Sequence, residues 1–305
     1  MEAGVENRLV RNILKLISGE GIGRAIGFMA APIVTRLYTS SDFGMLAVFA
    51  SLCALFYPFC TFKYTVAIPL HPNETVGINA LAACLLILAV NTVILAASLF
   101  LYHSQILSLF SSEAIDSFWY FIPLAFLFSG LADALSYYSI RYRDFSIIAK
   151  VTVVQKIIGA LTKIGLGLLH FNIVGLLIGN ILAGSGGLSL YIRNYWNRLK
   201  DNVRKVTPGR IRFILKRYIE FPSYRLPSQI LQNASGSIPV LYFAWQYGAS
   251  VTGLISLAIS MLSVPVGIVC TSVGKAFYGE IALLGRKNSP EIAALTGRIM
   301  IRLLA

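Results

Sequence analysis

The stretch VGINALAACLLILAVNTVILAASLFLY, residues 76–102, contains neither a charged side chain nor a proline. A helix rises about 1.5 Å per residue, and ~20 apolar residues suffice to cross ~30 Å of hydrocarbon. Similar runs recur along the chain. We predict spans near residues 12–37, 43–70, 76–102, 118–139, 146–169, 172–192, 222–246 and 250–277, and a ninth beginning around Glu291. Because lipid offers the backbone no hydrogen-bond partners, these runs predict an all-α polytopic membrane protein.

The composition agrees with a membrane protein and excludes a soluble enzyme. Of 305 residues, 56% are hydrophobic and 13% are charged, and the mean hydropathy is +0.72, which is too apolar to form a soluble surface. The net charge of +13 would suit a nucleic-acid partner in a soluble protein, but the cations lie mainly between apolar runs. The four cysteines and three histidines show no metal-ligand spacing. We therefore predict no nucleic-acid partner, no metal and no cofactor.

The distribution of cations predicts the orientation. If the N-terminus is cytoplasmic, the cytoplasmic segments and adjoining span ends carry seventeen Lys or Arg, nine of them between Arg193 and Arg217, whereas the outer segments carry only Arg36. This asymmetry is what the positive-inside rule requires. Within the longest polar segment, Ile211, Ile214, Leu215 and Tyr218 follow Thr207-Pro208-Gly209 at helical spacing, which indicates a basic amphipathic helix at the membrane surface. It could contact lipid headgroups, link two halves of the protein, or be an ordinary positive-inside loop.

A repeat divides the chain into two lobes. Residues 32–52 resemble residues 239–261: each run passes from a proline through a short turn to a glycine, Gly44 or Gly253, and the downstream prolines Pro58 and Pro265 continue the match. We therefore predict two six-helix bundles related by a pseudo-two-fold axis along the membrane normal. The N-terminal lobe covers residues 1–192, a basic linker 193–221, and a partial second lobe 222–305. Completing that lobe would need roughly 100 more residues.

Ionisable side chains inside spans mark the candidate site, because they are costly in lipid and are tolerated where they face a cavity or a partner. Lys156 and Lys163 are seven residues apart and project from nearly the same face of one helix. Arg24 lies one turn after Glu20, so these two could form an ion pair. In such a cavity, several cations would favour a polyanion such as a diphosphate. The predicted substrate-binding residues are Arg24, Lys156, Lys163, Arg225, Gln229 and Gln232.

Two carboxylates and one polar stripe have open interpretations. Glu20 and Asp133 are the deepest acids and could serve in ion coupling or as counter-ions of nearby cations. Arg225, Gln229 and Gln232 form a stripe that should face the bundle interior, where it could contact either substrate or neighbouring helices.

Three blocks of sequence resemble the polysaccharide transporter family, the Wzx-type O-antigen flippases. They are VTRLYTSSDFG at residues 34–44, FPSYRLPS at 221–228 followed by Ile238-Pro239, and Lys63-Tyr64 with AIPL at 67–70. The resemblance implies a two-lobed exporter in the bacterial inner membrane that moves polyprenyl-diphosphate-linked oligosaccharide by alternating access. It also implies membrane lipids and polysaccharide polymerase or assembly proteins as partners.

Four alternatives differ in what they require of the sequence. A multidrug or cation antiporter of the same superfamily would need intramembrane acids more than bases. A membrane glycan polymerase or glycosyltransferase would need a large outer loop rich in Arg, His or Asp, whereas the longest outer connection, residues 103–116, has no Lys or Arg. An inactive or truncated version of a longer transporter, or a scaffold subunit, also fits. The glycan, the coupling ion and the oligomeric state are not encoded in any recognisable pattern.

Overall fold

A computed structural model describes residues 2–70, 73–109, 113–262, 278 and 296–297, and within these ranges the chain is helical and has no strand. The long helices are α1 (Glu2–Leu37), α2 (Ser40–Phe56), α3 (Glu74–Leu109), α4 (Phe121–Arg141), α5 (Phe145–Leu168), α6 (Asn172–Ser185), α7 (Leu188–Val203), α8 (Pro208–Arg217) and α9 (Leu226–Leu262). Short 3-10 or π turns are η1 (Tyr57–Phe59), η2 (Tyr64–Leu70), η3 (Glu113–Phe118) and η4 (Phe221–Arg225). The predicted all-α class is confirmed.

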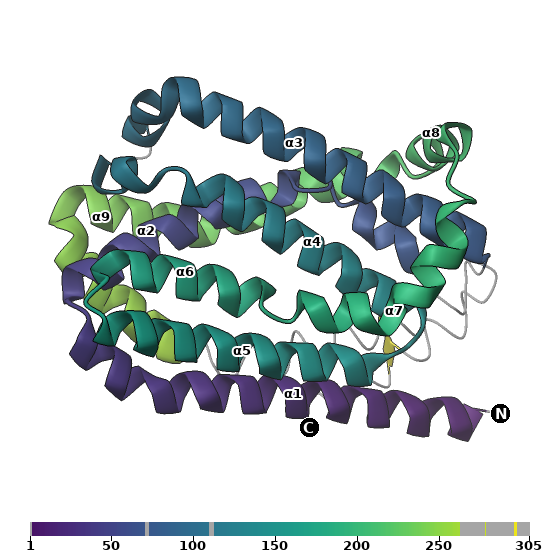
Figure 1. Ribbon diagram of the computed structural model, residues 1–305, viewed down its shortest axis with the longest axis horizontal. Helices are drawn as coiled ribbons and strands as arrows, with labels where there is room; N and C mark the ends of the chain where they lie inside the picture. Colours follow the sequence, from purple (N-terminus) through teal and green to yellow (C-terminus); the bar gives the residue numbers. More distant parts are fainter. Residues whose placement is uncertain (1, 71–72, 110–112, 263–277, 279–295, 298–305) are drawn as a thin grey trace.

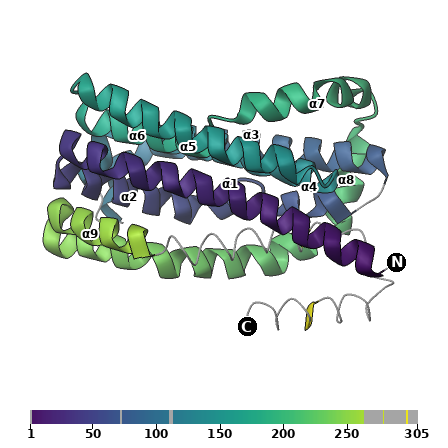
Figure 2. The ribbon, with the colours of Figure 1, turned by 90° about the horizontal axis from the view of Figure 1, so that it is seen from below.

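The long helices run side by side along one axis. Figure 1 shows α1, α5, α6, α4 and α3 in succession across the bundle, with α2 and α9 behind them. Figure 2, seen from below, places α9 on the side of α1 and α2 that is opposite to α5 and α6. The turn between α1 and α2 lies at one end of the bundle, and the start of α1 lies with α7 and α8 at the other end (Figure 1).

Five segments are long and apolar enough to cross a membrane. They are Ser40–Phe59, Glu74–Gln105, Phe121–Arg141, Phe145–Leu168 and Asn172–Val203. Helices α1 and α9 run beside them (Figure 2) but carry more polar side chains, among them Glu20 and Arg24 in α1 and Gln229 and Gln232 in α9. The protein is therefore a multi-pass membrane protein, as its composition predicted.

The second span is shorter than its sequence suggested. We expected it to run from residue 43 to residue 70, but α2 ends at Phe56 and the chain continues through the turns η1 and η2. Pro58 and Pro69 lack the N–H that a continuing α-helix would need, and Phe62 and Lys63 adopt positive φ angles of 47° and 62°. Apolar composition alone could not distinguish this irregular segment from a helix.

Small residues let the helices that form the bundle approach closely. A Cβ added at Gly19 of α1 would lie 2.7 Å from the Ala149 Cβ of α5, and a Cβ at Gly159 of α5 would collide with Ala183 of α6. Contacts of this kind drive helix association in membranes, where lipid removes the hydrophobic driving force. Helices α1, α5 and α6 therefore pack closely side by side and form one wall of the site described below.

The two segments paired by the predicted repeat each have a proline inside a long helix. Pro32 lies inside α1 and Pro239 inside α9, and α9 bends at Gly248, whose φ of 78° is in the left-handed region that glycine adopts without strain. The bend separates the predicted seventh and eighth spans. Pro265 and the ninth span expected near Glu291 lie outside the described residues.

The amphipathic helix predicted in the linker forms as α8, but its apolar side packs on the protein. Ile214 is buried, and Leu215 and Tyr218 pack against the core cluster around Tyr138 and Tyr195. The Tyr64 hydroxyl donates to the Leu215 carbonyl at 3.0 Å. Helix α3 and the turn η2 therefore cover this apolar side.

Candidate functional site: a cavity with two lysines

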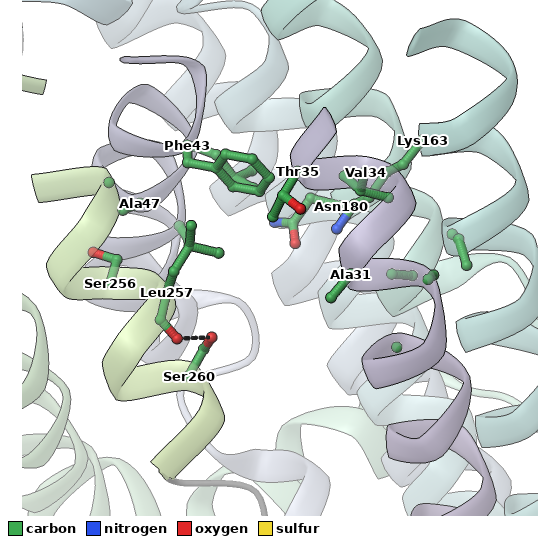
Figure 3. Close-up of a pocket in the computed structure, with 18 of the residues that line it drawn as sticks. Ala31, Val34, Thr35, Phe43, Ala47, Lys163, Asn180, Ser256, Leu257 and Ser260 are labelled. Carbon is green, nitrogen blue, oxygen red and sulfur yellow. Dashed lines mark hydrogen bonds between the residues drawn. The ribbon is translucent and has the colours of Figure 1, made fainter. Parts of the chain in front are cut away.

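A cavity of about 410 Å³ is lined by α1, α2, α5, α6 and the second half of α9. Figure 3 shows Ser256, Leu257 and Ser260 of α9 on one side and Ala31, Val34 and Thr35 of α1 on the other, with Phe43 of α2 between them. Most of the wall consists of small or apolar side chains. The polar and charged lining residues are Thr35, Lys156, Lys163, Asn180, Ser256 and Ser260.

Lys156 and Lys163 both line this cavity, as their seven-residue spacing on α5 predicted. The Lys156 ammonium donates to the Ala183 carbonyl at 3.4 Å, and its stem lies against Gly23 of α1. The Lys163 stem lies against Gly179 of α6. Glycine on the neighbouring helices therefore makes room for each lysine stem at its helix contact.

The electrostatics of the cavity are one-sided. Among its described lining residues there are two cations and no carboxylate. Charges in a low-dielectric surround interact far more strongly than they do in water, so the two ammonium groups favour an anion in this cavity. Lysine is a compact donor that suits phosphate oxygens as a point charge.

Ser256 lines the cavity, but its hydroxyl has no partner. Its hydroxyl is buried, and no described residue forms a hydrogen bond with it. Leaving a buried hydroxyl unsatisfied costs about 1–3 kcal/mol, and in this conformation the buried oxygen does not reach the cavity surface. Asn180 of α6 supplies a further polar side chain to the wall.

The turn between α1 and α2 is fastened to α5 beside the cavity. The Tyr38 hydroxyl donates to the Lys163 carbonyl at 2.7 Å, and the Tyr38 ring packs edge-on against Phe43. Gly167 and Gly175 have no side chain where the Tyr38 ring lies. Tyr38 therefore fastens the α1–α2 turn onto α5 beside Lys163.

Asp133 lies at a second cavity, of about 320 Å³. Its carboxylate accepts from the Thr65 hydroxyl at 3.1 Å, and no described lysine or arginine forms an ion pair with it within 4.0 Å. The wall is rich in hydroxyl and amide groups, contributed by Tyr57, Ser129, Ser136, Tyr137, Thr152, Gln155 and Tyr191. Two of its lining residues join α5 to α6, because the Gln155 amide donates to the Gly184 carbonyl at 2.8 Å.

The two predicted arginines lie outside both cavities. Arg24 and Glu20 are half-buried on α1, but neither is among the described lining residues of either cavity. Arg225 is exposed and ends the π turn η4, which contacts η2. A π turn inside a helix often accompanies a functional position. The structure thus brings together two of the four predicted cations, Lys156 and Lys163.

The polar stripe on α9 bonds within itself and to α2. The Gln229 amide donates to Gln232 at 3.1 Å and to Asn233 at 2.9 Å, and the Asn233 amide donates to the Ala54 carbonyl at 2.6 Å. Of the two interpretations left open by the sequence, these contacts favour a link to a neighbouring helix.

Sequence reasoning missed Asn180 and Ser256 because each is a single uncharged polar residue in an apolar run. It also gave Lys63 no place in the site, although the Lys63 ammonium lies 4.7 Å from the centre of the Tyr57 ring, beside the Asp133 cavity. Within the described residues, no three His, Cys, Asp or Glu side chains gather in a way that could hold a metal ion.

Comparison with known proteins identifies one family. The sequence model of a family described as "Polysaccharide biosynthesis protein" matches residues 33–299, which is most of the chain. No curated protein and no solved structure matches significantly.

Proposed function

Because this chain belongs to the polysaccharide biosynthesis protein family, we propose that it is a flippase for polyprenyl-diphosphate-linked oligosaccharide rather than an enzyme. The observation that supports this proposal most is the two-lysine cavity, a chamber of about 410 Å³ whose described wall has two cations and no carboxylate. Such a chamber suits the diphosphate, which is the part common to every substrate of this class. Apolar walls do not suit a long glycan, so the sugar would lie outside this cavity.

The proposed cycle requires no covalent chemistry. Lys156 and Lys163 hold the diphosphate while the polyprenyl chain remains in lipid, and the two lobes rock so that the cavity opens first to the cytoplasm and then to the outside. The cavity is bounded by α1, α5 and α6 on one side and by α2 and α9 on the other, so relative movement of these elements would change its access. The bacterial inner membrane and a cytoplasmic N-terminus belong to this proposal.

The experiment measures lipid-linked repeat units that face the cytoplasm in cells from which the gene has been deleted. The wild-type gene should clear them, whereas Lys156→Ala with Lys163→Ala should leave clearance at least about tenfold slower, because each lost ion contact to phosphate is worth roughly 1.5–3 kcal/mol. Lys150→Ala is the matched control: this lysine is exposed on the same helix and lies outside both cavities.

Arginine variants form a second part of the clearance experiment. Arg24→Ala and Arg225→Ala should impair clearance only if the site extends beyond the described cavity. A Lys156→Ala and Lys163→Ala double variant that is expressed and clears the units at the wild-type rate would refute the proposal.

One observation favours a cation antiporter as the alternative. The Asp133 cavity offers a carboxylate, several hydroxyl groups and no described ion-pair partner for the acid, which is a setting for a cation. If Asp133→Asn abolishes export of a cationic drug while the lysine variants do not, the antiporter is the better assignment.

A further inference from the structure

The side of α8 that faces away from the protein is defined by the contacts on its other side. Ile214 is buried, and the Leu215 carbonyl accepts from Tyr64 at 3.0 Å. The segment before α8 is held by Asn79 of α3, which donates to the Lys205 carbonyl at 3.1 Å and accepts from the Thr207 N–H at 3.0 Å. The helix therefore cannot rotate freely, and its opposite side is presented outward.

That outward side combines an aromatic ring with cations. Phe213 is 58% exposed, and Lys216 and Arg217 follow it by three and four residues, so the three side chains share one face. The Arg217 guanidinium lies 6.0 Å from the centre of the Phe213 ring. Arg212 is exposed on the same outer side.

Helix α7 repeats this combination. Ile192, Trp196 and Val203 form an exposed apolar stripe, with Trp196 58% exposed, while Tyr191 and Tyr195 on the other side are buried in the core. The exposed cations Arg193 and Lys200 flank the stripe. From Arg193 to Arg217 the chain carries nine cations and a single acid, Asp201.

The headgroup layer of a membrane satisfies both components. Water would leave the Trp196 and Phe213 rings exposed, and the hydrocarbon core would leave the cations without partners. The headgroup layer accommodates an aromatic ring at the acyl boundary and basic side chains at the phosphates. Both helices lie at the end of the bundle, where that layer would surround them (Figure 1).

We propose that the outward faces of α7 and α8 form a docking surface for anionic phospholipid headgroups, with Trp196 and Phe213 entering the acyl boundary and Arg193, Lys200, Lys216 and Arg217 contacting the phosphates. The net charge of the segment favours anionic over zwitterionic lipid. This surface does not depend on the cargo of the two-lysine cavity, so it stands or falls separately from the proposed function.

The test is quenching of tryptophan fluorescence by brominated lipids in the reconstituted full chain. Replacing Trp119 and Trp245 with Phe leaves Trp196 as one reporter, and a second variant places the reporter on α8 by Phe213→Trp with Trp196→Phe. The vesicles contain phosphatidylcholine and phosphatidylglycerol, and phosphatidylglycerol makes up a tenth of the lipid. In one set of vesicles the phosphatidylcholine is brominated, and in the other set the phosphatidylglycerol is brominated.

Both reporters should be quenched, and brominated phosphatidylglycerol should quench about fivefold more than its mole fraction predicts, since one cation near the surface supplies roughly that preference. High salt should reduce the excess. Arg193→Gln with Lys200→Gln should abolish it at Trp196, and Lys216→Gln with Arg217→Gln should abolish it at position 213.

Arg36→Gln, which removes an exposed cation at the other end of α1, should leave the excess unchanged. Equal quenching by the two brominated lipids would overturn the anionic preference. Absence of quenching by either lipid would overturn the docking surface itself and would point to an acidic protein partner. Unchanged elution and melting temperature of each variant show that the comparison is made on folded protein.

Discussion

Gly44 of α2 and Gly253 of α9 face each other in a reciprocal contact. A Cβ at Gly44 would collide with the backbone of Ala249, four residues before Gly253, and a Cβ at Gly253 would collide with the backbone of Ser40, four residues before Gly44. If residues 40–44 and 249–253 were interchanged, each of the two contacts would take the place of the other. This is the relationship that a local two-fold axis through the crossing requires, and the same two glycines were paired by the sequence repeat.

A methyl group at this crossing should be strongly destabilising. We predict that Gly253→Ala lowers the free energy of unfolding by about 3 kcal/mol, at the upper end of overpacking effects, because the added Cβ meets backbone that cannot swing away. Thermal unfolding in detergent, followed by size exclusion, measures the loss. Gly236→Ala on the same helix is the control, since nothing lies within 4 Å of a Cβ there; it should be neutral or slightly stabilising. Equal effects of the two substitutions would mean that α2 and α9 do not cross as described.

The same crossing can be locked covalently. The Ser40 and Ser250 hydroxyl oxygens are 2.8 Å apart, so Ser40→Cys with Ser250→Cys, in a background without the native cysteines, should form a disulfide under mild oxidation. If α2 and α9 separate during transport, oxidation should stop clearance of lipid-linked units and a reductant should restore it. Cleavage at a protease site inserted in the linker before α8 reports the bond, because the two halves then stay joined only when oxidised.

A bond that forms without affecting clearance would show that this crossing stays closed throughout the cycle. Either cysteine alone serves as the control and should be insensitive to the oxidant.

Ser256 separates a binding role from a structural one. Because its buried hydroxyl has no described partner, Ser256→Ala should raise the free energy of unfolding by about 1 kcal/mol, the reverse of the usual effect of a core substitution. The same variant should slow clearance if the hydroxyl binds cargo. Thr252 is the matched comparison, since its hydroxyl donates to the Gly248 carbonyl at 2.9 Å and Thr252→Ala should destabilise. A Ser256→Ala protein that melts earlier and transports normally would contradict the assignment.

Hydropathy and periodicity correctly predicted features of a single helix, such as its position in the chain and the residues that share one of its faces. The span expected over residues 146–169 is α5, Phe145–Leu168, and the seven-residue spacing of Lys156 and Lys163 placed both on the face that lines the cavity. These properties follow from apolar length and from about 3.6 residues per turn, and both are local.

Neighbour relations between helices could not be predicted in the same way. Periodicity gives the face of a helix but not the helix it meets, so Arg24, Arg225 and the two lysines were grouped by charge although α5 and α6 place only the lysines at one cavity. Asn180 and Ser256 reach that cavity from positions 76 residues apart in the chain, and neither carries a charge that would have drawn attention. For residues 57–70, Pro58 and Pro69 indicated that the helix would end. The apolar composition of this segment nevertheless led to the prediction of a continuous span.

Asn79 shows how a single buried amide holds the segment before α8 to α3. It is fully buried in α3, donates to the Thr75 carbonyl at 2.7 Å and to the Lys205 carbonyl at 3.1 Å, and accepts from the Thr207 N–H at 3.0 Å. Asn79→Ala removes all three bonds and should cost about 2–3 kcal/mol, because each net hydrogen bond contributes about 1 kcal/mol.

The loss should be local as well as global. Amide hydrogen exchange in Lys205 to Ile211 should accelerate more than exchange in α5, since the clamp holds only the start of α8. Asn194→Ala is the control: Asn194 is exposed and donates one bond to Asp144 at 3.2 Å, so its removal should change neither measurement by more than a few tenths of a kcal/mol. Uniform acceleration across α5 and α8 would instead mean that Asn79 supports the whole bundle, and the fixed orientation of the α8 outer face would then need another cause.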